Sequence, residues 1–298
     1  MDEDAARTGR KTRGAGIDPR TFYEGKTVLV TGAGSGLGRA LALEAGRRGA
    51  GVYASDADSD AAEKTCRLFE NGSPGAFCAP LRLDVTDPED FDRVFAGIER
   101  ESGALDVLIN NAGQCAVGES ATVPPDRFCR IIDVNLKGTA YGTASAFRRM
   151  VRAGEGLIVN ISSLSGQLAY PVTLAYTASK AGIDALTTGL AAEARGTGVR
   201  VSLVRLGTVD TPAYRTQEVW GMSRNDFVSL LPGRMLPANR ASRIILDRAA
   251  RGRSKITAPL SSAAVLFVIR RFPGTAALIR NRAMRRFRSA AARRKGDR

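Results

Sequence analysis

The chain has 298 residues, 44% hydrophobic and 25% charged, which supplies enough apolar material for a sizeable globular core. It contains no histidine, which excludes every imidazole-based mechanism and every histidine-ligated metal or haem site. Residues 238–298 carry 17 Lys or Arg against two Asp, so the formal charge of +14 lies at one end and a uniformly basic nucleic-acid-binding domain is excluded.

Along the chain, residues 1–20 mix charges with Gly and Thr without apolar periodicity, and they are predicted to form a disordered leader. From residue 26 onward, short β-branched runs alternate with longer amphipathic stretches. Strands are predicted at residues 26–31, 51–55, 79–84, 105–110, 156–162 and 199–206. This alternation predicts an α/β fold, a single-domain Rossmann-like doubly wound parallel sheet over residues 21–259.

The first predicted strand runs into a glycine-rich turn, Thr31-Gly32-Ala33-Gly34-Ser35-Gly36-Leu37-Gly38, which a helical stretch follows. In doubly wound sheets, ligands bind beyond the carboxyl ends of the strands. Glycines there allow a tight turn and let a pyrophosphate approach the N–H groups of the helix N-terminus. A flexible loop without a ligand is the alternative, and the position between an apolar strand and a helix favours the dinucleotide site.

Acidic residues follow the second and third strands. Asp56 lies 24 residues after Gly32, where a carboxylate can bind an adenosine ribose and repel a 2′-phosphate. This favours NAD(H), with NADP(H) as the alternative, although a turn or helix cap is an equally ordinary role for an Asp. Asp84 is predicted either to meet the adenine edge or to open the next turn.

Polar residues gather after the fourth and fifth strands. Asn110-Asn111-Ala112-Gly113 ends strand four, Asn135 lies in the next helical stretch and Ser163 follows strand five. Tyr176 and Lys180 are four residues apart, on one face of a predicted helix. Each of these residues alone has a common structural role, but together and without histidine they indicate a catalytic set.

These motifs resemble those of the short-chain dehydrogenase/reductase family, in its compact single-domain branch. The resemblance covers residues 26–214 and rests on T-G-x-x-x-G-x-G, N-N-A-G, Asn135, Ser163 and Y-x-x-x-K, in the family's order. A branch with T-G-x-x-G-x-x-G, which holds many sugar-nucleotide epimerases and dehydratases, matches the glycine spacing less well.

The resemblance implies an NAD(P)-dependent oxidoreductase that interconverts a small-molecule alcohol and its ketone or aldehyde. Tyr176 would be the general acid/base, and Lys180 with an oxidised nicotinamide would lower its pKa and hold the nicotinamide ribose. Ser163 would bind the substrate oxygen, and Asn135 would support a water chain through Lys180. The implied cofactor-binding residues are Gly32, Gly34, Ser35, Gly36, Leu37, Gly38, Asp56, Asp84, Val85, Asn111, Ala112, Gly113, Tyr176, Lys180, Gly207, Val209 and Thr211.

After the sixth strand, the family usually shows Pro-Gly and then a Thr that contacts the nicotinamide. Here Leu206 replaces the proline, while Gly207 and Thr211 keep their places, so a looser loop is predicted. Residues 213–235 fall where the family has its substrate lid. Their apolar side chains motivate the expectation of a lipophilic substrate; they include Tyr214, Trp220, Met222 and Phe227.

A helical pattern over residues 238–252 and a last strand over 254–260 lead to a basic amphipathic extension, residues 260–298. The extension holds 11 Lys or Arg and one Asp. It is interpreted either as a contact with an anionic membrane surface, as packing on the protein's own body or a second subunit, or as a solvated end. Nucleic-acid binding is not expected, because no groove-reading motif accompanies the charge.

The chain has four cysteines without C-x-x-C spacing, so we predict no disulfide framework and no metal site. It opens without an apolar signal sequence, so a cytoplasmic location is expected, with peripheral membrane association as the alternative. The longest apolar run, residues 263–269, is too short to span a bilayer. The resemblance also implies a homodimer or homotetramer. Two other functions stay open: an epimerase or dehydratase on this scaffold, and a non-catalytic NAD(H)-binding protein with a membrane- or partner-binding tail.

Overall fold

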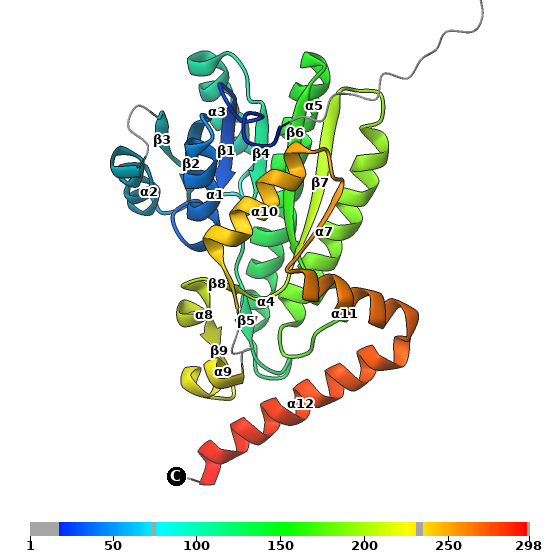
Figure 1. The fold of residues 1–298 in the computed structure, drawn as a ribbon. Coiled ribbons are helices and arrows are strands. Elements are labelled where there is room, and N and C mark those ends of the chain that lie inside the picture. Colours follow the sequence, from blue (N-terminus) through cyan, green and yellow to red (C-terminus); the bar gives the residue numbers. More distant parts are fainter. Residues whose placement is uncertain (1–17, 73–75, 231–234, 297–298) are drawn as a thin grey trace, which may run out of the picture.

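The computed structural model describes residues 18–72, 76–230 and 235–296 (Figure 1). The predicted disordered leader, residues 1–20, therefore lies almost wholly outside the described residues. Its last three residues begin a turn in which the Arg20 N–H donates to Asp18 Oδ1 at 2.9 Å.

A seven-stranded parallel sheet forms the centre of the molecule, in the order β3-β2-β1-β4-β6-β7-β11 (Figure 1). Its strands are β1 (Thr27–Thr31), β2 (Gly51–Asp56), β3 (Cys78–Arg82), β4 (Val107–Asn110), β6 (Gly156–Ser163), β7 (Val199–Leu206) and β11 (Lys255–Ala258). Every predicted strand is present, with ends within two residues of the prediction. The strand order reverses direction between β1 and β4, which is the place where doubly wound sheets bind ligands.

Helices cover both faces of the sheet, so the predicted Rossmann-like fold is confirmed. Alternate strand residues point to opposite faces: Val28 and Val30 pack in one buried cluster, and Leu29 lies in another. The first cluster includes residues of α1 and α10, and the second includes residues of α3 and α5. The main helices are α1 (Gly36–Arg47), α2 (Ser59–Gly72), α3 (Pro88–Ser102), α4 (Pro125–Ile132), α5 (Gly138–Ala153), α7 (Leu174–Glu193) and α10 (Ala238–Ala250).

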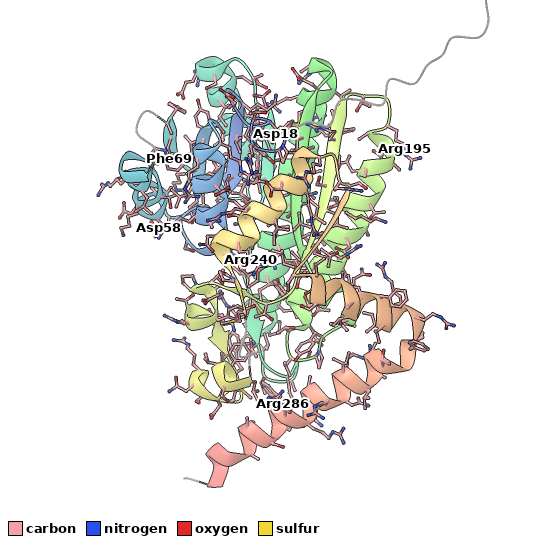
Figure 2. The ribbon with its side chains drawn as sticks, viewed as in Figure 1. Asp18, Asp58, Phe69, Arg195, Arg240 and Arg286 are labelled. Atoms are coloured by element: carbon pink, nitrogen blue, oxygen red, sulfur yellow. A yellow bond between two sulfur atoms is a disulfide. The ribbon has the colours of Figure 1, made fainter. Side chains whose placement is uncertain are left out.

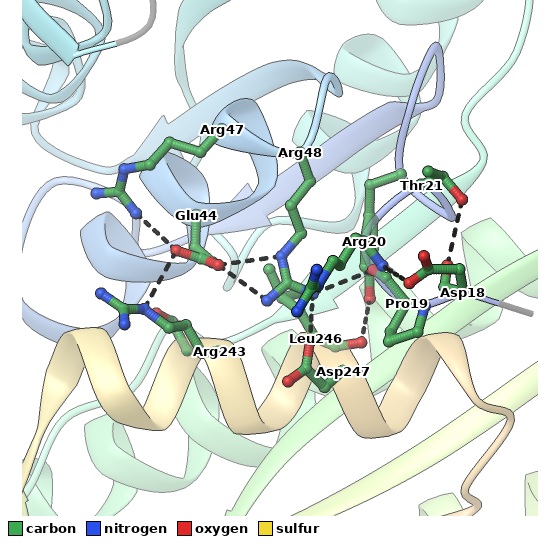
Figure 3. Close-up of polar contacts among 12 residues, drawn as sticks. Asp18, Pro19, Arg20, Thr21, Glu44, Arg47, Arg48, Arg243, Leu246 and Asp247 are labelled. Atoms are coloured by element: carbon green, nitrogen blue, oxygen red, sulfur yellow. Dashed lines mark hydrogen bonds and ion pairs between the residues drawn. The ribbon is translucent and has the colours of Figure 1, made fainter.

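A partly buried polar contact ties α1 to α10 (Figure 3). Arg48 donates to Glu44 Oε1 from Nη2 and to Asp247 Oδ1 from Nη1, each at 2.8 Å, and also to the Pro19 carbonyl at 3.2 Å. Its side chain is 10% exposed. The N-terminal turn and the end of α10 are therefore held against the same helix.

The cysteines depart from expectation. Cys66 on α2 and Cys78 at the start of β3 form a disulfide, whereas Cys115 and Cys129 are free thiols. The prediction of no disulfide framework is thus wrong for this pair. Sequence spacing did not reveal the bond, because it depends on how α2 folds back onto β3.

The C-terminal extension forms two helices, α11 (Leu260–Arg271) and α12 (Pro273–Gly296) (Figure 1). One face of α11 packs on the body, where Leu266 and Ile269 lie in a cluster with Leu168. No single described helix meets the length and hydropathy criteria for crossing a membrane, but α11 and Pro273–Ala292 together meet them as a pair bent by 116°. Part of the extension, one face of α11, therefore packs on the protein's own body.

Candidate active site

The glycine-rich turn joins β1 to α1 by a tight backbone path. Gly32 and Gly36 have φ of +65° and +52°, a region that favours glycine. A Cβ added at Gly38 would lie 2.0 Å from the Gly32 carbonyl oxygen. Ser35 is the N-cap of α1 in an extended conformation, and its side chain makes no capping bond. The first N–H groups of α1, at Gly36, Leu37 and Gly38, therefore lack intrahelical acceptors and suit a phosphate.

Asp56 lies against this turn at the end of β2. Its Oδ2 accepts from the Gly34 N–H at 2.9 Å, and its Oδ1 accepts from the Asp58 N–H at 3.1 Å. The guanidinium of Arg39 is occupied by the Gly34 carbonyl and by Thr65 Oγ1. The Asp56 carboxylate thus lies beside the glycine-rich turn, where an adenosine ribose would lie. It also stabilises the local turns by accepting backbone hydrogen bonds.

Thr31 connects the two central strands and was absent from the predicted binding set. Its Oγ1 accepts from the N–H groups of both Asn111 and Ala112 at 3.0 Å. Asn111 Nδ2 in turn donates to the Thr31 carbonyl at 3.0 Å. Since Thr31 opens the T-G motif, its place in that motif was the signal that could have identified it. It holds the N-N-A-G segment beside the glycine-rich turn.

The next predicted residues line the same edge of the sheet. Asp84 Oδ1 accepts from the Thr86 N–H at 2.9 Å and from Thr86 Oγ1 at 2.7 Å, so Asp84 stabilises the turn that follows β3. Val85 is buried, and a Cβ at Gly138 would lie 2.8 Å from it. An adenine contact by Asp84 or Val85 stays a prediction.

The structure brings Ser163, Tyr176 and Lys180 together. Ser163 is the last residue of β6, and its Oγ donates to the Leu206 carbonyl at 3.4 Å and accepts from the Ser165 N–H at 3.2 Å. Its side chain also lies near that of Tyr176 and lowers the pKa of the Tyr176 phenol. Lys180 Nζ lies 5.5 Å from the centroid of the Tyr176 ring and donates to the Ile161 carbonyl at 2.8 Å. The spacing of Tyr176 and Lys180 on α7 places both side chains beside the end of β6.

Burial dominates the electrostatics of this cluster. It raises the pKa of the Tyr176 phenol, and Cys115 and Tyr214 raise that pKa further, while the Ser163 side chain lowers it. Burial also lowers the pKa of Lys180 to about 8. In the protein alone, burial therefore raises the Tyr176 pKa because the charged form is desolvated. The lowering by Lys180 together with a bound oxidised nicotinamide stays a prediction.

Asn135 acts as a connector in the described residues. It lies in the π-helical segment η1 (Asp133–Lys137) and is fully buried. Its Nδ2 donates to the Gln114 carbonyl at 2.9 Å and to Ser179 Oγ at 3.0 Å, and its Oδ1 accepts from the Gln114 N–H at 2.7 Å. Gly113 packs beside it. The contact with α7 positions that helix, and the proposed water chain stays a prediction.

The loop after β7 closes over the glycine-rich turn. The Gly207 N–H donates to the Ala258 carbonyl at 2.8 Å, and β8 (Val209–Asp210) pairs with β10 (Leu236–Pro237). A Cβ added at Gly36 would lie 3.2 Å from Thr211 Cβ. Backbone pairing therefore holds the loop in which Leu206 replaces the expected proline.

Cys115 is a site residue that sequence analysis missed. It comes two residues after the N-N-A-G motif, which was the available signal. Burial raises the pKa of its thiol to about 12, although the charge of Lys180 lowers it in part. It packs with Val117, Val172 and Met222, so it joins the surroundings of Tyr176 and Lys180 to an apolar wall.

Thiol labelling should distinguish the free cysteines. At pH 8 we expect Cys129, which is exposed, to be alkylated by iodoacetamide at least about a hundredfold faster than Cys115, because a raised pKa leaves less thiolate. The Cys115 rate should rise with pH until about pH 12. Peptide mass spectrometry measures both sites. Urea-unfolded protein is the control, in which both should react alike; equal rates in the native protein would contradict the burial of Cys115.

The short chain dehydrogenase family model matches residues 26–220. A 2-(R)-hydroxypropyl-CoM dehydrogenase of Xanthobacter autotrophicus is 34% identical over 190 residues, covering 63% of this chain and 76% of that protein. A 3-oxoacyl-[acyl-carrier-protein] reductase of Thermotoga maritima is 33% identical over 235 residues, covering 78% and 94%. A crystal structure of a short-chain type dehydrogenase/reductase from Mycobacterium marinum has a TM-score of 0.72 at 28% identity, covering 80% of this chain and 95% of that one.

Proposed function

Since the chain belongs to the short-chain dehydrogenase/reductase family and is an NAD(P)-dependent oxidoreductase acting on CH–OH groups, we propose that it prefers NAD(H) and acts on a lipophilic alcohol or its carbonyl compound. The observation that carries the proposal is the cluster of Ser163, Tyr176 and Lys180 at the end of β6, next to the glycine-rich turn. A bound nicotinamide cofactor supplies the hydride acceptor or donor.

The protein's own residues handle the proton and the substrate oxygen. Tyr176 is protonated in the protein alone, because burial raises its pKa, so it is ready to donate to a carbonyl oxygen. Ser163, whose side chain lies near Tyr176, would hold the same oxygen. Lys180 Nζ makes one hydrogen bond to the described residues, to Ile161, so its other two N–H groups are available for ribose hydroxyls.

An apolar wall supports the choice of a lipophilic substrate. The buried cluster next to Cys115 contains Val117, Val172, Met222 and Phe287. Phe287 comes from α12, which contacts α9 (Arg224–Leu230) of the lid. Tyr176 itself packs near Trp220 in a neighbouring cluster. The catalytic tyrosine thus stands between polar groups and a largely hydrocarbon surface.

A panel of alcohols tests the function. We expect NADH formation, measured by absorbance, with kcat/KM rising as the alcohol becomes longer and more apolar, because each buried methylene adds about 0.8 kcal/mol. Cofactor binding without turnover of any alcohol or carbonyl compound would overturn the proposed substrate class. Higher kcat/KM for short polar alcohols would overturn its lipophilic part.

Cofactor preference rests on Asp56. The Asp56→Ser change should raise kcat/KM with NADP(H) relative to NAD(H) by about tenfold or more, because a carboxylate beside the ribose repels a 2′-phosphate. The matched control is Asp58→Ser, which removes an equal charge two residues away and should leave the ratio unchanged. Steady-state kinetics with both cofactors measure the ratio, and a wild-type preference for NADP(H) would contradict the prediction.

A further inference from the structure

The helix α11 is apolar on two opposite faces, and the described residues cover only one of them. Leu266 and Ile269 are 5% and 7% exposed against the body. The other face carries Phe267 at 69% exposure and Val268 at 41%. A helix that is apolar all round is normally buried on all sides, so the outer face of α11 lacks a partner within the described chain.

The uncovered surface continues around the bend between α11 and α12. Phe272, between the two helices, is 54% exposed, and Leu278 in the first turns of α12 is 64% exposed. Figure 1 places this bend at the edge of the molecule, away from the sheet, and Figure 2 shows side chains projecting outward from both helices there. We refer to Phe267, Val268, Phe272 and Leu278 as the elbow surface.

Positive charge is spread along the extension that carries the elbow surface. Residues 260–296 contain ten Lys or Arg and no Asp or Glu. Some arginines hold the extension to the body: Arg288 pairs with Glu119 at 2.8 Å, and Arg270 donates to Gln167 at 3.0 Å. Others are exposed and form no ion pair with the described residues; they are Arg271, Arg282, Arg285 and Arg286.

We propose that the elbow surface and these four arginines bind the surface of an anionic lipid bilayer. Exposed Phe and Leu side chains suit insertion at the acyl–headgroup boundary, and arginines beside them suit anionic headgroups. A second copy of the chain fits less well, because a two-fold contact would bring like charges together and the segment has no acid to pair them. The inward face of α12 stays on the lid, so membrane contact requires no unfolding of the extension.

Vesicle flotation of the full-length protein tests this proposal. We expect it to float with phosphatidylcholine vesicles that contain phosphatidylglycerol, and about tenfold less with phosphatidylcholine alone or at high salt. The Phe267→Ser/Phe272→Ser variant should lose binding to the anionic vesicles by about tenfold. Arg271→Gln/Arg282→Gln should reduce the preference for anionic over neutral vesicles.

The matched control is Phe77→Ser, because Phe77 is 50% exposed and lies next to β3, at the opposite edge of the sheet from β11. This variant should float as the wild type does. Thermal melting checks that every variant is folded. Absence of flotation, equal flotation with neutral vesicles, or wild-type flotation of the double Phe variant would overturn the proposal. So would an oligomer that this variant converts to monomers without vesicle binding, since the elbow surface would then be a subunit interface.

Discussion

The Tyr176→Phe variant is expected to lose about 10²–10⁴-fold in kcat while it still binds the cofactor. The change removes one hydroxyl group from a partly buried ring beside Ser163 and Lys180. The ring keeps its packing against its neighbours, so the loss falls on proton exchange with the substrate oxygen. Turnover of an alcohol found in the panel and cofactor affinity by NADH fluorescence measure the two properties separately.

Tyr141→Phe serves as its control, since Tyr141 is a partly buried tyrosine on α5 that packs in a different core cluster from Tyr176. It should keep wild-type turnover. If Tyr176→Phe also kept full turnover, Tyr176 would not be the acid/base, and a non-catalytic cofactor-binding role would regain support. If the wild-type protein converted its substrate without added cofactor, an epimerase with tightly bound NAD would explain its activity better.

The second large effect is expected from Arg205→Met, which should lower the free energy of unfolding by about 3–5 kcal/mol. Arg205 Nε donates to Asp184 Oδ2 at 2.8 Å, and both side chains are less than 10% exposed. Gln167 Nε2 donates to the same oxygen at 2.6 Å. Without Arg205, the Asp184 carboxylate stays buried without its cation. Urea denaturation measures the loss.

The matched control is Arg67→Met, because the Arg67–Glu63 pair is 71% and 49% exposed and should contribute less than about 1 kcal/mol. The Asp184→Leu/Arg205→Met double variant should recover much of the lost stability, since it leaves no unpaired buried charge. A loss within 1 kcal/mol for Arg205→Met would show that water or Gln167 satisfies Asp184 instead. The pair also joins α7 to the end of β7, so it holds the helix that carries Tyr176 in place.

Most of the fold and part of the site were predictable from local pattern. Buried parallel strands are short apolar runs between amphipathic helices, and this signal located all seven strands. The motif residues came together because the carboxyl ends of parallel strands share one edge of the sheet. Thr31 and Cys115 lay inside or beside those motifs, and only their contacts showed what they do.

The sequence by itself determined the fold, the family and the candidate catalytic residues, because each depends on periodicity or on short motifs at fixed spacing. Only the tertiary structure decided the Cys66–Cys78 bond, the Asp184–Arg205 pair and the placement of α12 on the lid. These features join residues whose approach depends on how helices pack. The direction of the Tyr176 pKa shift belongs with them, because burial by side chains from several elements sets the cost of charge at that position.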